Sequence, residues 1–306
     1  MAERPCATML DCWYVCSVIR RACIPSSFEP THSSCAVKRL ETLMDIDLSI
    51  ALILGMVALL AGFFDAIVGG GGLLTLPALF VAGLDPLSAM ATNKLQASCA
   101  SVSATAAFAR RGMIDWRADA GPAIASCMAG AAGALSISMI PRGVLQAAIP
   151  LLLLAVAAYF ALSPKVDERP RKSRISRYAF MLAVVPIIGF YDGVFGPGTG
   201  SFFMIAFMLL LAQPLLTAVC RSKLLNAACN VGALSVFMLN GAVLWPLALI
   251  MSVAAITGAQ LGARCALRLG THLIKPVVII VCCLMALKLL WSAEHPVRLW
   301  IEALPG

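Results

Sequence analysis

The sequence predicts an all-α polytopic membrane protein with about eight transmembrane helices in two homologous four-helix halves. Its composition, its long apolar runs and an internal duplication carry this prediction. Of the 306 residues, 61% are hydrophobic and 12% are charged, with a mean hydropathy of +0.92, whereas a soluble domain would carry roughly 25% charged residues. The composition excludes a soluble enzyme, a nucleic-acid-binding module and a disordered chain. It also argues against an outer-membrane barrel, whose strands alternate polar and apolar residues.

Residues 1–45 differ from the rest because they lack a long apolar run and mix both charge signs. The stretch 13–19 is too short and too polar for a secretory signal, so we expect a disordered N-terminal extension. Met44 directly precedes the first apolar segment, and one hypothesis is that residues 1–43 arise from an upstream start codon. The 12 cysteines of the chain include no CxxC pair and no zinc-type spacing, so no metal or other cofactor is predicted.

Ten apolar segments follow this extension. Two of them, 72–83 and 200–211, are too short to cross a bilayer as helices. Each follows a glycine-rich break, so both are predicted to be re-entrant, which is tolerated where the backbone is buried or lines a wet cavity. The other eight are predicted to cross the membrane: 48–68, 87–109, 118–140, 143–162, 178–195, 214–239, 242–263 and 272–291. They give a first repeat at 46–163, a basic loop at 164–177, a second repeat at 178–292 and a tail at 293–306.

Basic residues gather in the loops 110–117 and 163–177. Such clusters between apolar segments indicate the cytoplasmic side. With eight crossings, both loops and both termini are predicted to be cytoplasmic, and the loops near Asp85, Pro141 and Gln213 lie on the other side. Arg264 and Arg268 then fall on the outer side, against the rule.

The two halves of the chain are copies of each other. Residues 62–69 match residues 189–196, and farther along Lys94 meets Lys223 and Trp116 meets Trp245 at a constant offset of 129 residues. With an even number of crossings in each half, the repeats are predicted to be parallel and related by an axis along the membrane normal. Duplicated halves with interrupted segments in corresponding positions are typical of a secondary transporter.

Polar residues follow each glycine break inside a segment that is otherwise apolar. A lysine within the membrane costs roughly 2.5–3.5 kcal/mol and normally faces a cavity or a partner, although snorkelling to the surface is the alternative. Side chains three, four or seven residues apart share a helix face, so Lys94 and Lys223 each stand above hydroxyl or amide groups. The side chains predicted to bind a small oxyanion are Lys94, Lys223, Thr92, Asn93, Gln96, Ser98, Ser101, Arg221, Ser222, Asn226 and Asn230.

Asp65 and Asp192 are the other matched charges, each four residues before its glycine break. They could carry a proton or pair with the lysines, and they could equally cap the broken backbone. The glycines also have two interpretations, because glycine-rich turns bind anions through backbone N–H groups and small residues let helices pack closely. We expect packing for Gly258 and Gly262, and for Ala129 and Gly133, and a ligand-facing role for Gly70, Gly71, Gly72, Gly198 and Gly200.

Several motifs, in order, resemble the sulfite-exporter TauE/SafE family of the transmembrane anion transporter superfamily, in its widespread bacterial branch. The stretches that carry the resemblance are Gly62–Ala78, Ala91–Cys99, Arg111–Arg117, Gly189–Phe202 and Ser222–Val231, and it extends over about 48–291. The resemblance implies a multi-pass plasma-membrane carrier for sulfite, sulfonates or related organosulfur anions, driven by the proton gradient. It does not imply a particular substrate or direction of transport.

Two other classes of function stay open from the sequence. A membrane-embedded enzyme or assembly factor is the first, but no cluster of His, Asp and Glu lies on a membrane helix, so no catalytic residue is predicted. An anion channel is the second. The expected partners are the lipid bilayer, a small anion and protons, with no nucleic acid, and the oligomeric state is left open.

Overall fold

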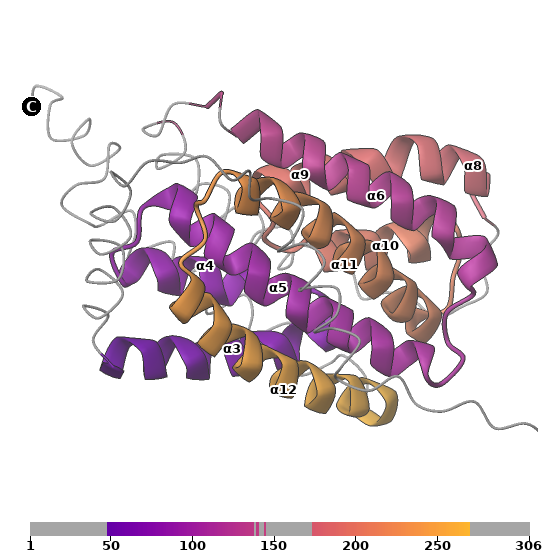
Figure 1. Ribbon diagram of the computed structural model, residues 1–306. Helices are drawn as coiled ribbons and strands as arrows, with labels where there is room; N and C mark the ends of the chain where they lie inside the picture. Colours follow the sequence, from indigo (N-terminus) through magenta and orange to yellow (C-terminus); the bar gives the residue numbers. More distant parts are fainter. Residues whose placement is uncertain (1–47, 138, 141–143, 145–172, 270–306) are drawn as a thin grey trace, which may run out of the picture. The chain divides into compact units, whose positions relative to one another are not determined.

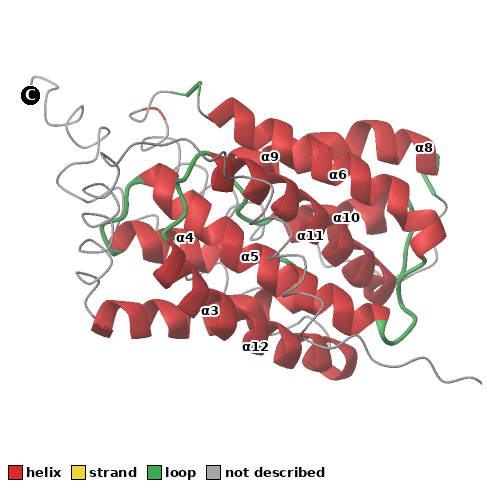
Figure 2. Ribbon diagram, in the orientation of Figure 1, coloured by secondary structure: helices red, strands yellow, loops and turns green. Residues whose placement is uncertain are grey.

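The computed structural model describes residues 48–137, 139–140, 144 and 173–269, which form helices joined by short loops, with no strand among them (Figure 1 and Figure 2). The compact unit that contains all of them is Asp47–Gly306. The all-helical prediction is confirmed for this part of the chain. The predicted extension 1–45 and the predicted crossings 143–162 and 272–291 lie outside the described residues, apart from Val144.

The helices are α3 (Leu48–Val68), α4 (Gly72–Val81), α5 (Pro86–Ala109), α6 (Trp116–Ile137), α8 (Arg177–Ala179), a π-helical turn (Phe180–Val184), α9 (Val185–Val194), α10 (Thr199–Leu210), α11 (Leu215–Leu239) and α12 (Trp245–Leu269). Within the described residues, five stretches are long and apolar enough to cross a membrane: Leu48–Ile67, Trp116–Ile137, Arg177–Val194, Leu215–Leu239 and Trp245–Ala266. Although α5 is about 36 Å long, it carries the polar strip that lowers its hydropathy.

The sequence determines where helices begin and where they break. Asp85 caps α5, because its side chain accepts a hydrogen bond from Ser88 N at 3.2 Å. Pro86 follows at the first helical position, where the missing N–H has no helical partner to lose. Gly69 and Gly196 lie in the two breaks with φ values of 90° and 93°, a conformation that favours glycine. The two breaks therefore begin with a glycine of the same left-handed conformation at matched positions.

Each break folds the chain back into a hairpin. In the second half, Arg174 N donates to Leu210 O at 2.8 Å, so the start of α8 meets the end of α10. In the first half, Gly71 N donates to Asp65 Oδ1 at 3.2 Å. A methyl group built on Gly71 would lie 3.0 Å from Ala61 O, so α4 turns back along α3. Each long helix and the short helix after it thus enter and leave at the same end of the bundle.

One end of the bundle, called here the Arg111 end, holds the loop 110–115 and the starts of α6, α8 and α11. Asp119 in the first turn of α6 pairs with Arg221 in the second turn of α11. The guanidinium carbon of Arg221 lies 5.1 Å from the ring centroid of Phe207 in α10. Since α10 ends beside the start of α8, the described part of the second basic loop, residues 173–177, lies at the same end as the loop 110–115, as the charge pattern predicted.

The opposite end, called here the Asp85 end, is held together by one apolar cluster. Its members come from α4, from the starts of α5 and α12 and from the ends of α6 and α11, and they include Leu76, Phe80, Leu87, Met90, Ile137, Phe237, Val243 and Ala248. Along α3 and α12, Gly55 faces Ile250 and Gly62 faces Ala255, so these two helices are parallel. Figure 1 shows α3, α5 and α12 running in one direction and α6, α9 and α11 in the other.

The last described long helix of each half packs against the other half. Gly133 of α6 lies against the carbonyl of Phe190 in α9, and Gly262 of α12 lies against the carbonyl of Phe63 in α3. These four residues are two sets of equivalents in the duplication. A Cβ at either glycine would overlap the neighbouring carbonyl, so the prediction that Gly133 and Gly262 serve helix packing is confirmed.

The described helices of the two halves are inverted with respect to each other. α5 and α11 hold equivalent positions in the duplication yet run in opposite directions, and so do α6 and α12. The prediction of parallel repeats is therefore wrong. It treated α3 and the helical stretch Arg177–Val194 as crossings followed by short re-entrant segments, but each is the longer arm of a hairpin that returns the chain to the end where it entered. The axis that relates equivalent helices lies across the helices rather than along them.

This arrangement also corrects the predicted sides of several residues. Gln213, expected opposite the basic loops, lies at the Arg111 end, where its N–H donates to Phe207 O at 3.2 Å. Leu48 begins α3 at the Asp85 end, opposite the loop 110–115, whereas the two chain termini, predicted on the side of the basic loops, lie outside the described residues. Arg264 moves to the Arg111 end, which removes the violation of the charge rule. Among the described residues, all exposed basic side chains lie at that end: Arg110, Arg111, Arg117, Arg174, Arg177 and Arg264.

Candidate functional site

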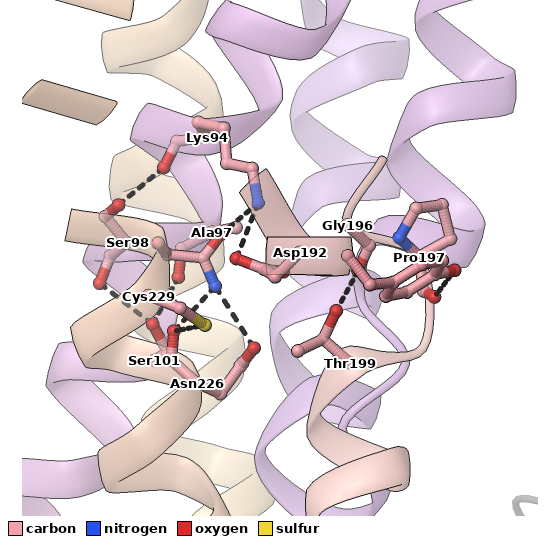
Figure 3. Close-up of polar contacts among 12 residues, drawn as sticks. Lys94, Ala97, Ser98, Ser101, Asp192, Gly196, Pro197, Thr199, Asn226 and Cys229 are labelled. Carbon is pink, nitrogen blue, oxygen red and sulfur yellow. Dashed lines mark hydrogen bonds and ion pairs between the residues drawn. The ribbon is translucent and has the colours of Figure 1, made fainter. Parts of the chain in front are cut away.

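Lys94 lies about 12 Å along α5 from Pro86 and is only 1% exposed. Its ammonium group donates to Asp192 Oδ2 at 2.7 Å and to Asn230 Oδ1 at 3.1 Å. Figure 3 shows Lys94 reaching down to Asp192 from the neighbouring helix. Both acceptors belong to the second half of the chain, so this lysine does not snorkel to the surface.

Lys223 repeats this arrangement from the other direction. It lies about 12 Å along α11 from Leu215 and is fully buried, with its ammonium nitrogen 3.2 Å from Asp65 Oδ2. The other oxygen of Asp65 accepts the hydrogen bond from Gly71 N. Asp65 therefore pairs with a lysine and also caps the broken backbone, and the two roles that the sequence left open coexist.

The two ion pairs are crossed between the halves, since each lysine takes the aspartate of the other repeat. α5 and α11 run in opposite directions, so the Lys94 pair is nearer the Asp85 end and the Lys223 pair is nearer the Arg111 end. Burying a lone charge is costly, and a pair compensates that cost only with good geometry and further hydrogen bonds. Crossed pairing gives all four charged groups a partner inside the bundle.

The two glycine breaks meet between these pairs. The backbone of Gly69 is in close contact with the backbone of Gly200, and a side chain at either position would force them apart. A methyl group built on Gly196 would lie 3.1 Å from Lys94 Nζ, and one built on Gly200 would lie 3.1 Å from Lys223 Nζ. Both ammonium groups thus border the same turn, 196–200, in which Gly198 is left-handed with a φ of 80° and precedes α10.

Gly70, Gly71 and Gly72 form the first turn on the other side of this contact. A methyl group on Gly72 would lie 3.6 Å from the Cα of Pro197 in the second break. Gly71 uses its N–H on Asp65, as described above, whereas a methyl group on Gly70 would face Leu73. These glycines therefore allow the two hairpins to pack closely where they meet, next to the two lysines.

The serine hydroxyl groups predicted to bind an oxyanion are engaged elsewhere. Ser98 donates to Lys94 O at 2.6 Å, Ser101 donates to Ala97 O at 2.7 Å, and Ser222 donates to Val219 O at 2.8 Å. Each bond runs back to the preceding turn of the same helix, a common arrangement for serine in helices. In this structure they offer oxygen lone pairs rather than hydrogen atoms.

The amide and threonine candidates connect helices. Thr75 of α4 donates to the side-chain oxygen of Asn93, and Thr92 accepts from Leu244 N at 3.3 Å. Asn230 Nδ2 donates to Asn226 Oδ1 at 3.1 Å, which leaves its own oxygen for the lysine. Gln96 is buried, and its Oε1 has no hydrogen-bond partner among the described residues.

Arg221, the remaining candidate, belongs to a separate pair. Its Nε donates to Asp119 Oδ1 at 2.7 Å, its Nη2 contacts the same oxygen, and both side chains are buried. Arg221 and Lys223 are two residues apart, so they leave α11 on nearly opposite faces. The structure therefore does not bring Arg221 to the lysine–aspartate pairs. Asp119 is the partner that the sequence analysis missed, although its position inside an apolar segment was a usable signal.

The described residues contain no group of three or more His, Cys, Asp or Glu side chains that could hold a metal ion. The site instead contains two ammonium groups, two carboxylates and a glycine-rich backbone. Such a set can bind an oxyanion by charge-assisted hydrogen bonds, and its carboxylates can exchange protons if water reaches them.

Comparison with known proteins adds a family and its relatives. Residues 54–289 match the family described as Sulfite exporter TauE/SafE. The chain is 43% identical over 259 residues to the "Probable membrane transporter protein ORF9" of a Sinorhizobium species, an alignment that covers 85% of this chain and 99% of that protein.

Two further relatives have similar names. The "Probable membrane transporter protein YfcA" of Escherichia coli K12 is 42% identical, covering 83% of this chain and 96% of that protein. A "Probable membrane transporter protein" of Haemophilus influenzae is 39% identical, covering 81% of this chain and 98% of that protein. No solved structure matches the chain.

Proposed function

Because the chain belongs to the sulfite exporter TauE/SafE family of membrane transporters, we propose that it is a secondary carrier for small sulfur-containing oxyanions, coupled to protons. The crossed lysine–aspartate pairs at the contact of the two glycine breaks carry this proposal. Family membership argues against the membrane-enzyme alternative, since the relatives are named as transporters.

Lys94 and Lys223 supply the positive charge for the anion. Both ammonium groups border the turn 196–200, which leads into α10. Inverted repeats with broken helices at their contact are typical of carriers that alternate access around a central site. This geometry favours a carrier over a channel, because the breaks are packed against each other rather than open.

Asp65 and Asp192 supply the coupling. Each aspartate is paired with the ammonium group that an anion would bind, so the anion competes with the carboxylate for that ammonium group. Protonation of that carboxylate removes the competition. Proton uptake and anion binding then favour each other, as linked equilibria require.

We also assign the Arg111 end to the cytoplasm of a bacterial plasma membrane. Its exposed arginines satisfy the positive-inside rule, and the exposed charged side chain described at the other end is Asp85. In this orientation Leu48 begins α3 on the outer side.

Flux into proteoliposomes tests the proposal. Labelled sulfite and a panel of sulfonates are offered with and without an inward proton gradient. Saturable uptake that the gradient accelerates is expected for at least one of them, with Arg110→Gln, an exposed residue away from the site, behaving like the unmodified protein. Non-saturable flux would indicate a channel, and no flux with any member of the panel would contradict the substrate class.

A further inference from the structure

The buried charges of the described bundle balance. The buried charged residues are three carboxylates and three cationic groups: Asp65, Asp119, Asp192, Lys94, Lys223 and Arg221. Each carboxylate is paired with one cation. The described part of the bundle interior is therefore neutral before any anion binds, and the described residues hold no spare buried positive charge to compensate one.

A bare anion would bring one uncompensated charge into this interior. Moving an ion out of water costs several kcal/mol of solvation free energy even after the protein relaxes. A lysine already neutralised by a carboxylate at 2.7 Å cannot offset that cost. Protonating the carboxylate removes one negative charge and leaves the ammonium group free. The pair then returns to neutrality with the anion in place of the carboxylate.

From this balance we propose that each lysine–aspartate pair takes up one negative charge of the substrate together with one proton, so that transport moves no net charge. The proton binds Asp192 when the anion binds Lys94, and it binds Asp65 when the anion binds Lys223. In each case the aspartate belongs to the other repeat from the lysine. The inference rests on the proposed function and adds its stoichiometry: one proton for a monovalent oxyanion, and two for a divalent one that spans both ammonium groups.

Among the described groups around Asp192, Asp192 itself is the one that takes the proton. Lys94 faces it from α5 and Cys229 from α11, and Tyr191 precedes it on α9 with its hydroxyl bonded to Pro197 O at 2.7 Å. On α6, which packs against α9, Asp119 is held by Arg221, and α10 carries no charged residue.

The neighbours of Asp65 give the same result. Lys223 faces it from α11, and the backbone of Gly71 from α4. α4 and α10 carry no charged residue, and the charged residue of α5 is Lys94, which already has its own partner. On α12, which packs on α3, Arg264 is exposed and lies near the Arg111 end.

The test uses methanesulfonate, whose single charge does not change with pH, and the full chain in proteoliposomes. A potassium gradient with valinomycin sets the membrane potential, and a trapped pH dye counts protons. If net charge moves, a potential of about 100 mV changes the final accumulation of a monovalent anion roughly 50-fold. We expect no change with potential and one proton taken up for each anion.

The variants Asp192→Asn and Asp65→Asn, singly and together, complete the experiment. The double variant retains both ammonium groups without their carboxylates, so its uptake is expected to become proton-independent and to respond to potential. Potential-driven uptake by the unmodified protein would overturn this inference while leaving the anion carrier intact. If methanesulfonate is not taken up, the same measurement is made with a sulfonate of the panel that is, and absence of saturable uptake of every member would contradict both proposals.

Discussion

Asp192 and Asp65 each neutralise a lysine from the other half of the chain, and this pairing makes the four residues interdependent. Removing one member leaves the other buried without a partner, which is far more costly than removing both. The same residues therefore contribute to the stability of the bundle and to the proposed chemistry, and a single substitution cannot separate the two contributions.

A double-mutant cycle distinguishes a lysine and an aspartate that contact each other from a lysine and an aspartate of the same repeat, which are not paired. Lys94→Gln and Asp192→Asn should be strongly non-additive, with a coupling of about 0.5–3 kcal/mol, as found for groups in contact. Lys94→Gln combined with Asp65→Asn is the matched control and should be close to additive. Unfolding in detergent, followed by tryptophan fluorescence, supplies the free energies. Equal coupling in both combinations would contradict the crossed pairing.

Anion affinity gives a second prediction for these residues. Lys94→Gln retains length and polarity but removes the charge, so the apparent affinity should fall roughly 10- to 100-fold, corresponding to about 1.5–3 kcal/mol for a charged hydrogen bond. Arginine is not a safe control, because its planar group needs a different pocket. Concentration-dependent uptake measures the change, and unchanged affinity at normal expression would place the anion elsewhere.

Residue types at this site could be predicted from the sequence, but their partners could not. Matched lysines and aspartates next to matched glycines are visible in one chain. The partner of Lys94, however, depends on whether the aspartate beside it comes from the same repeat or from the other one. The duplication in the sequence does not show which. For Ser98, the sequence does not show that its hydroxyl donates to a carbonyl of its own helix.

At the level of helices, the two equivalent contacts between long helices differ in their chemistry. Arg221 and Asp119 form a buried ion pair between α11 and α6. The equivalent positions on α5 and α12 are Thr92 and Ala248, where Thr92 accepts a backbone N–H instead. The ion pair is thus a local feature of the Arg111 end rather than a requirement of the fold.

The duplication supplies a replacement for that pair. Arg221→Thr alone should destabilise the protein by about 3–5 kcal/mol, because Asp119 would be left buried and charged. Arg221→Thr with Asp119→Ala recreates the chemistry of the first half and should recover most of the loss. Thermal unfolding in detergent checks both. A double variant as unstable as the single one would show that the pair has a role beyond charge compensation.

Helix packing at the glycines gives a prediction with an internal control. A methyl group on Gly262 would lie 3.0 Å from Ala66 Cβ and closer still to the carbonyl of Phe63, so Gly262→Ala should cost about 1–3 kcal/mol, as overpacking does. On the same pair of helices, a methyl group on Gly55 would lie 3.6 Å from Ile250, an ordinary contact, so Gly55→Ala should be tolerated. Melting temperatures of the two variants decide the matter.

For the whole molecule, the crossed pairs join two groups of helices that each draw on both repeats. α12 packs on α3 and α5, while α6 packs on α9 and α11. Lys94 and Asp65 belong to the first group, and Asp192 and Lys223 to the second. A proton and an anion that bind here would break the lysine–aspartate ion pairs that the described residues form between the two groups. Breaking them would let the two groups move relative to each other, as alternating access requires.

The sequence predicted the helices in the described part of the chain but not their directions. Apolar length identifies α3 as a possible crossing, and nothing in that length shows that α4 returns beside it. The error has a physical origin, since a short helix after a glycine break reverses the chain as effectively as a full crossing. Arg264 was the signal against the parallel arrangement, because it placed positive charge on the side predicted to be outside.

Inverted and parallel repeats place two loops differently, and cysteine labelling distinguishes them. Arg111 lies in the loop between α5 and α6, and Asn240 lies between α11 and α12, both exposed. In a background without native cysteines, Arg111→Cys and Ser173→Cys should resist an impermeant maleimide in intact cells, since the Arg111 end carries the arginines that favour the cytoplasm. Asn240→Cys should react in the same cells, because α11 carries the chain to the Asp85 end. Permeabilised cells, in which all three should react, are the control for reactivity. Labelling of Arg111→Cys and Asn240→Cys from the same side would restore the parallel arrangement and would remove the basis for crossed pairing between inverted halves.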